Sequence, residues 1–113
     1  MPKVVIAGLA ELRKKQSVKF KFRRDGISRD GFAALFQGQV IVYENVCRHL
    51  PLSIDYGDNQ FFTGNGKEIV CKTHGAIYDP PTGLCTSGPC QGLSLFKIPF
   101  EVRAEKIWIE TEE

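Results

Sequence analysis

Two short cysteine–histidine pairs constrain this chain more than any other feature. Cys47-x-His49 and Cys71-x-x-His74 each place a thiol and an imidazole close together, and the chain has no other histidine. Four cysteines in a chain expected to stay in a reducing compartment indicate metal binding or redox chemistry more than structural disulfides. Two thiols and two imidazoles can ligate one metal centre if the fold brings the pairs together.

The rest of the pattern predicts a mostly β fold. Short runs of β-branched and aromatic residues are separated by Gly, Pro, Asn and Asp, and no amphipathic helical period exceeds about two turns. Strands are expected at 18–23, 32–36, 40–44, 61–62, 68–71, 93–98 and 106–110, with turns at 24–26, 37–39 and 64–66. Residues 45–60 and 72–92 are expected to be loops. Each cysteine–histidine pair therefore lies at a strand end, where loops leaving one sheet edge can converge.

Composition indicates one globular domain. Of the 113 residues, 42% are apolar and 25% are charged, which excludes disordered, collagenous and membrane-spanning classes. The longest uncharged stretch, 80–96, contains three prolines and cannot cross a bilayer as a helix. Residues 4–10 are too short and glycine-broken for a secretory leader, so a cytoplasmic location is expected.

Basic charge concentrates at the N-terminus. Residues 1–30 hold nine Lys and Arg against three acids, whereas residues 31–113 hold six against ten. The basic residues either form a docking face for an acidic partner or occupy the solvated side of a strand. Nucleic-acid binding is not expected, because no recognisable module interleaves basic and aromatic residues.

The mixed order of the ligands favours iron and sulfur over zinc. In a two-iron cluster of the mixed type, one iron takes two cysteines and the other takes two histidines. Two loops that each offer one cysteine and one histidine can clamp such a cluster from opposite sides. Zinc fingers usually draw their cysteines from one pair and their histidines from another.

These residues resemble the Rieske family. Two motifs carry the resemblance: Cys47-x-His49-Leu50 and Cys71-x-x-His74-Gly75. Twenty-one residues lie between His49 and Cys71. The resemblance continues through Ala76-Ile77-Tyr78-Asp79 and Gly83, and Gly88-Pro89-Cys90 is similar to the proline-bearing third loop of Rieske proteins.

The resemblance implies a single Rieske domain over residues 1–113. Its fold would be an antiparallel β-sandwich with a cluster-binding subdomain, approximately residues 45–92, formed by loops after strand ends. It implies one [2Fe-2S] cluster per chain, with Cys47 and Cys71 on the buried iron and His49 and His74 on the outer iron, where electrons leave.

Rieske centres have reduction potentials of roughly −150 to +300 mV. The residues around the expected cluster imply a potential in the lower part of this range. Ala76 stands where high-potential members carry a serine donor, whereas Tyr78 retains a hydroxyl donor. Leu50, Pro51 and Pro89 are expected to form an apolar collar that limits water. The expected surroundings of the cluster are Leu50, Gly75, Ala76, Tyr78 and Pro89.

Four further side chains lie near the expected centre. Cys85 and Cys90 are interpreted as buried structural thiols, because free cysteine commonly packs as a small hydrophobe. A disulfide between them is sterically possible but not expected in a reducing compartment. Arg48 and Lys72 are expected as exposed charges that either steer an acidic partner or are only solvated.

The predicted function is that of a Rieske-type ferredoxin, a carrier and not itself an enzyme. It would accept one electron from a flavin-type reductase and deliver it to an oxygenase or another reductase component, without membrane or nucleic acid. Both histidines are committed to the cluster, so the chain cannot build the mononuclear iron site of an oxygenase. Two alternatives stay open: a cluster-bearing small subunit of a nitrite-reductase-like complex, and a zinc-stabilised interaction module.

Overall fold

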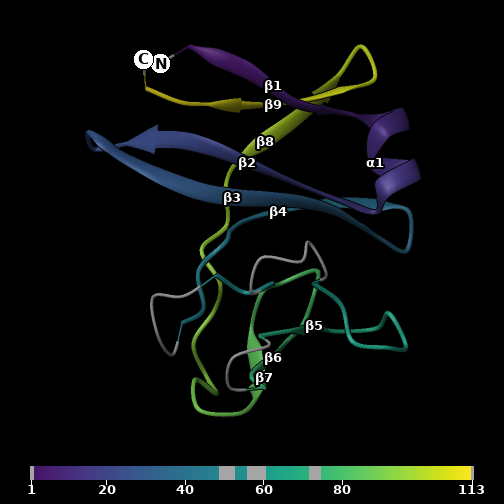
Figure 1. Ribbon diagram of the computed structural model, residues 1–113, viewed down its shortest axis with the longest axis vertical. Coiled ribbons are helices and arrows are strands. Elements are labelled where there is room, and N and C mark those ends of the chain that lie inside the picture. The colour runs from purple at the N-terminus through teal and green to yellow at the C-terminus, as the bar shows by residue number, and fades with distance from the viewer. Residues whose placement is uncertain (1, 49–52, 56–60, 72–74, 113) are drawn as a thin grey trace.

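Three small antiparallel sheets build the structure, a computed structural model that describes residues 2–48, 53–55, 61–71 and 75–112 (Figure 1). The mostly β prediction is confirmed. The first sheet contains β1 (Lys3–Gly8), β9 (Lys106–Glu110) and β8 (Phe100–Arg103), the second contains β2 (Ser17–Arg24), β3 (Ile27–Phe36) and β4 (Gln39–Glu44), and the third contains β5 (Ile69–Val70), β6 (Ile77–Tyr78) and β7 (Cys85–Ser87). One helix, α1 (Leu9–Lys15), leads from β1 to β2.

The second sheet is buried on both faces where the second half of β3 pairs with β4. Side chains alternate across a strand, so neighbouring residues enter different cores. On β3, Phe32 and Ala34 pack into one hydrophobic cluster, while Ala33 between them packs into the other. On β4, Tyr43 and Val42 divide in the same way. The sheet therefore separates an upper core, shared with the first sheet, from a lower core, shared with the third (Figure 1).

The upper core lies between the first two sheets. Ile107 and Ile109 of β9 and Phe22 of β2 are buried there. Helix α1 contributes Leu12, which is fully buried. Gln16 caps the end of the helix with a positive φ, and its N–H donates to the Leu12 carbonyl. In the described part of the chain, no helix is long and apolar enough to cross a bilayer.

The lower core joins the second sheet to the segments after β4. The Phe32 ring stacks on Phe61 with a centroid distance of 4.0 Å. Ile69 of β5 and Tyr78 of β6 are fully buried beside them. This core contains all four cysteines.

Several sequence predictions need correction. The strands expected at 18–23, 32–36, 40–44 and 106–110 are confirmed, but residues 93–98 form no continuous strand: Ser94 and Lys97 make only isolated bridges, to Leu84 and Tyr43. Likewise, of the pair expected at 61–62, only Phe62 makes a bridge. The expected loop 72–92 contains β6 and β7, and β1, β8 and α1 were not predicted.

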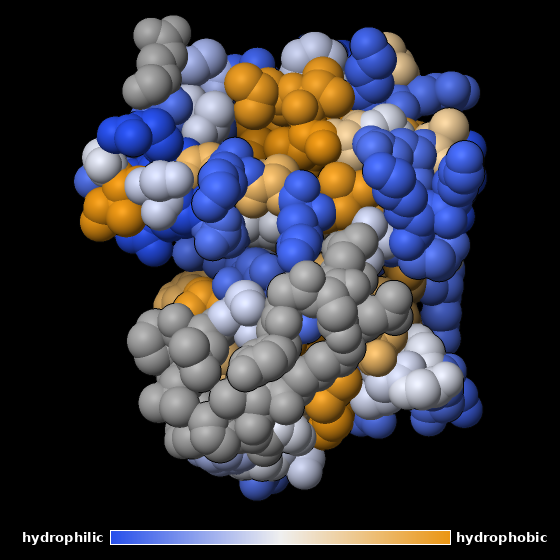
Figure 2. Space-filling view, viewed as in Figure 1, coloured by the Kyte–Doolittle hydropathy of each residue, from blue (hydrophilic) through white to orange (hydrophobic). Residues whose placement is uncertain are grey.

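Exposed apolar side chains gather over the first sheet. Figure 2 shows an apolar area at the top of the molecule, over the strands β1, β8 and β9, bordered by hydrophilic residues. Val4, Val5 and Val102 on these strands are each more than a third exposed. This surface lies at the far end of the molecule from the third sheet (Figure 1).

Tyr43 fastens the second sheet to the turn after β6. Its hydroxyl donates a hydrogen bond to the Pro80 carbonyl. Gly83 has a φ of +77°, and a Cβ there would come within 2.9 Å of the Tyr43 ring. A glycine is therefore required both by the backbone conformation and by the close approach of the ring.

The buried Tyr43 predicts a loss of stability in alkali. Burial, and then the nearby Asp79 carboxylate, raise the pKa of Tyr43 to about 12. Because this value lies above that of the unfolded chain, the contribution is complete below pH 10 and declines as the pH rises toward 12. We expect a loss of about 2 kcal/mol over that interval.

Urea unfolding of the wild type and Tyr43→Phe across this pH range checks the expectation. The variant should be less stable at neutral pH, because the buried Pro80 carbonyl loses its donor. The difference between the two proteins should then shrink in alkali. A difference that stays constant with pH contradicts the assignment.

Candidate metal centre

The loop after β4 is held at both ends by a buried polar cluster. The Asn45 amide donates to the Asp55 carboxylate at 3.2 Å and its oxygen accepts the Ile54 N–H at 2.8 Å. Lys19 of β2 lies 3.0 Å from the other Asp55 oxygen. Asp55 is fully buried, so its charge requires these partners. The cluster fixes where the loop that carries Cys47 leaves and rejoins the core.

The loop after β5 is closed by its own backbone. The Cys71 N–H donates to the Ala76 carbonyl at 2.8 Å, and the Gly75 N–H donates to the Cys71 carbonyl at 2.8 Å. Gly75 has a φ of +72°, a conformation that glycine adopts without the strain that a side chain brings. These two hydrogen bonds therefore fix Cys71 against Gly75 and Ala76.

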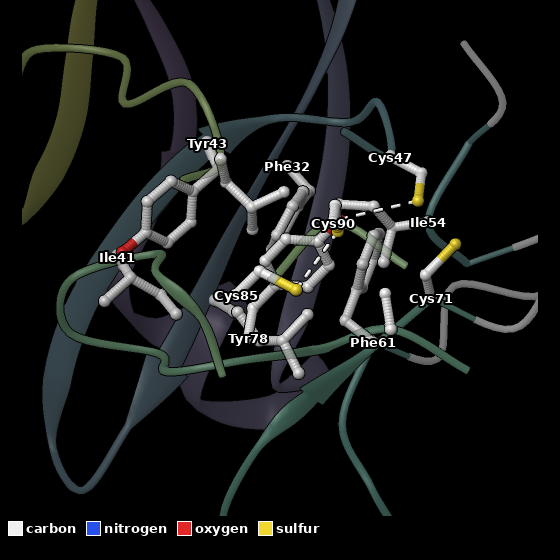
Figure 3. Packing of buried hydrophobic residues seen from close by; sticks show 14 residues of the cluster. Phe32, Ile41, Tyr43, Cys47, Ile54, Phe61, Cys71, Tyr78, Cys85 and Cys90 are labelled. Carbon is white, nitrogen blue, oxygen red and sulfur yellow. Dashed lines mark hydrogen bonds between the residues drawn. The ribbon is translucent and has the colours of Figure 1, made fainter. Parts of the chain in front are cut away.

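The two loops bring Cys47 and Cys71 to the same place. Both side chains belong to the lower core and are almost completely buried. In Figure 3 both side chains lie at the same end of the cluster of buried side chains. Two thiols from distant parts of the sequence thus face a common space, as the metal-ligand interpretation requires.

The Tyr78 hydroxyl lies between these loops. It is 3.5 Å from the Cys47 sulfur and 3.0 Å from the Cys90 sulfur, and it accepts the Arg48 N–H at 3.1 Å. Burial, followed by the contacts with the two sulfurs, raises the pKa of Tyr78 well above its ordinary value. The hydroxyl stays protonated and can donate one hydrogen bond.

The segment after β7 packs against the loop after β5. Gly88 has a φ of +101°, and a Cβ there would come within 2.9 Å of the Ala76 Cα. Pro89 follows on the exposed surface and Cys90 is buried, with its sulfur 3.1 Å from that of Cys85. The predicted burial of both thiols is confirmed, and none of the four cysteines forms a disulfide.

Arg48 is not the exposed charge that was predicted. Its guanidinium donates to the Ser94 carbonyl at 2.6 Å and lies 4.3 Å from the centre of the Phe96 ring. The side chain is only partly exposed because these contacts hold it against the segment that leads to β8. Arg48 therefore connects the loop that carries Cys47 to residues 94–96.

Five predicted residues lie outside the described part of the chain: His49, Leu50, Pro51, Lys72 and His74. Within the described part, no three Cys, His, Asp or Glu side chains group as metal ligands. Cys47 and Cys71 are nevertheless two of the four predicted ligands, and each lies within three residues of a histidine in the sequence. Their chemistry fits an iron–sulfur centre, because thiolates ligate iron and a hydroxyl group, that of Tyr78, lies 3.5 Å from the Cys47 sulfur.

Sequence reasoning missed the contacts that position the loops. The pairing of Asn45 and Asp55 across ten residues, and of Asp55 with Lys19, has no local signature. Cys90 was predicted to be structural, yet its sulfur contacts the same hydroxyl as Cys47 does. The one available signal was the position of Cys90 in the third loop.

Comparison with known proteins finds a matching family model. The family model described as "Rieske [2Fe-2S] domain" matches residues 3–99. The curated proteins contain no match to this sequence.

Solved structures share the fold over nearly the whole chain. The ferredoxin of carbazole 1,9a-dioxygenase from Nocardioides aromaticivorans IC177 matches with a TM-score of 0.72 at 24% identity, covering 99% of this chain and 100% of its own. The Sphingomonas yanoikuyae B1 ferredoxin matches with a TM-score of 0.71 at 21% identity, covering 98% and 100%. A chain from the complex of reduced oxygenase and oxidized ferredoxin in carbazole 1,9a-dioxygenase matches with a TM-score of 0.72 at 20% identity, covering 98% and 94%.

A matched pair of glycines tests the packing of the third loop. Gly88 and Gly92 both have positive φ, but only Gly88 would place a Cβ against backbone atoms. Alanine at either position brings backbone strain, and at Gly88 it also pushes the third loop away from Ala76. We expect Gly88→Ala to lower the free energy of unfolding by about 1–3 kcal/mol more than Gly92→Ala, measured by urea unfolding. Equal losses would show that this contact is unimportant.

Proposed function

Because the chain belongs to the Rieske [2Fe-2S] domain family, we propose that it is a ferredoxin-type carrier of single electrons. One [2Fe-2S] cluster per chain would be held by Cys47, His49, Cys71 and His74. The observation that carries this proposal is the meeting of two buried thiols, Cys47 and Cys71, from two loops of the lower core. A bound cluster supplies a site that takes up and gives up one electron reversibly.

An electron carrier of this kind also needs ligands held in fixed positions, limited access of water and a suitable potential, and residues of this chain provide for each. The Asn45–Asp55–Lys19 cluster and the turn closed by Gly75 set the positions of the two cysteines. The apolar lower core excludes water from the side that faces the sheet. Imidazole is neutral where thiolate is negative, so the two histidines make reduction easier than four cysteines would.

The same proposal assigns a role to each part of the chain. Residues 1–113 form one domain, in which approximately residues 45–92 bind the cluster. The sheets above them supply the support, since the second sheet contributes Phe32 and Tyr43 to the core beneath the ligand loops.

An oxygenase component is the proposed electron acceptor, and a flavin-type reductase is the proposed donor. The support for the acceptor is that one similar structure is titled as a complex of oxygenase with ferredoxin. In this proposal the carrier performs no substrate chemistry of its own. The reaction is completed by the acceptor.

Removal of one thiol ligand tests the proposal. The wild type, assembled with iron and sulfide, should be red-brown, contain both elements and give a reduced-state paramagnetic signal with a low average g. We expect Cys47→Ser to abolish the cluster, because an alcohol is a poor replacement for a thiolate ligand to iron.

Cys85→Ser is the matched control for this experiment. Cys85 is as deeply buried as Cys47 but is not a proposed ligand, so this variant should retain full iron and sulfide content. A colourless wild type that holds a single zinc ion would contradict the proposal.

Replacement of a proposed imidazole ligand tests the mixed ligand set. In His49→Cys a negative thiolate replaces a neutral ring and favours the oxidised state. The potential should fall toward the roughly −400 mV of all-cysteine plant-type clusters, or the cluster should be lost. Potentiometric titration followed by the paramagnetic signal measures the shift. An unchanged potential would exclude His49 as a ligand.

A further inference from the structure

A line of hydrogen-bonding groups runs from the candidate metal centre to the surface of β7. The Tyr78 hydroxyl lies 3.0 Å from the Cys90 sulfur, and the Cys90 sulfur lies 3.1 Å from the Cys85 sulfur. Cys85 in turn lies 3.3 Å from the Ser87 carbonyl oxygen. Dashed lines in Figure 3 mark the contacts among the drawn side chains. None of these three side chains is a proposed ligand.

The direction of each hydrogen bond follows from the end of the line. A carbonyl can only accept, so the Cys85 thiol donates to Ser87. A thiol has one proton, so Cys90 must be the donor in its contact with Cys85. Because the Cys90 proton is already in the hydrogen bond to Cys85, the Tyr78 hydroxyl must be the donor in its contact with the Cys90 sulfur.

Two observations agree with this direction. Burial, and then the contact with Cys90, raises the pKa of Cys85 to about 11, so its proton is present at neutral pH. The Tyr78 oxygen accepts the Arg48 N–H on its other side, at 3.1 Å. The hydroxyl therefore has one proton and two sulfurs that compete for it, and the Cys90 sulfur is nearer at 3.0 Å than the Cys47 sulfur at 3.5 Å.

We propose that Cys90 is a positioning residue that directs the Tyr78 hydroxyl proton away from Cys47. The proposal deepens the function given above and rests on it, because its effect is exerted on a sulfur that would bind the cluster. A hydrogen bond to a ligand sulfur stabilises the more negative, reduced state and raises the potential. With the proton held by Cys90, Tyr78 gives little of this stabilisation, and the potential is lower than the presence of a tyrosine alone indicates.

A double-mutant cycle on Tyr78 and Cys90 tests the proposal by potentiometry. Cys90→Ala removes the competing acceptor, so the hydroxyl turns to Cys47 and the midpoint potential rises. Tyr78→Phe in the wild-type background shifts the potential little, because the lost proton was not directed at Cys47. In the Cys90→Ala background the same Tyr78→Phe change cancels the rise. This non-additivity is what a merely structural role of Cys90 would not produce.

Further variants separate the hydrogen-bond direction from packing. Cys90→Ser keeps a group that both donates and accepts, so its potential should stay near that of the wild type. Cys85→Ala leaves the line without its middle acceptor and frees the Cys90 proton for the Tyr78 oxygen, so the potential should rise although Cys85 does not touch Tyr78. Ser87→Ala, which retains the carbonyl, should leave the potential unchanged. If Cys90→Ala does not assemble, Cys85→Ala supplies the same comparison.

Iron and acid-labile sulfide contents distinguish the two possible failures. A wild-type chain that contains neither overturns the proposed function and this inference with it. A cluster-bearing chain in which Tyr78→Phe lowers the potential equally with and without Cys90 overturns this inference alone. The expected result is a lowering by Tyr78→Phe that is confined to the Cys90→Ala and Cys85→Ala backgrounds.

Discussion

The burial of both faces of the second sheet is the constraint on which the rest of the structure depends. A sheet with one face exposed to solvent tolerates substitutions on that face. In β3, however, each side chain from Phe32 to Ala34 packs into one of the two cores. A slip of one residue in the β3–β4 pairing would exchange the two sets of side chains. Packing in the upper core and packing in the lower core therefore both fix the register of β3 and β4. As a result, the loop after β4 starts at a defined point below the sheet.

The candidate metal centre depends on that fixed exit. Between β4 and β8 the described segments contain only the short strands β5, β6 and β7, and individual polar contacts hold much of this part of the chain in place. A buried carboxylate, Asp55, holds both the amide of Asn45 and the ammonium group of Lys19. Such a cluster contributes little net stability, since desolvation offsets much of its attraction, but it penalises any other path of the loop.

The sequence predicted those parts of the fold whose signal is local. The alternation around Phe20 and the glycine-centred turn at Gly38 identified the central strands, because period and turn chemistry act over a few residues. Helix α1 was missed since its seven residues bury only Leu12. The strand expected at 93–98 has strand-like composition, yet this segment packs by side chains and isolated bridges. Contacts such as Arg48 with Ser94 join distant segments and leave no pattern in the sequence.

The Tyr78 oxygen joins three loops at one atom. It meets the backbone of the first loop at Arg48, belongs to the strand that closes the second, and contacts the third at Cys90. Loops tied in this way cannot shift independently, so the surroundings of the sulfur atoms rearrange little when a charge arrives or leaves. In the proposed electron carrier, a small rearrangement would keep the activation barrier to electron exchange low, and the Tyr78 side chain contributes to this rigidity without a covalent cross-link.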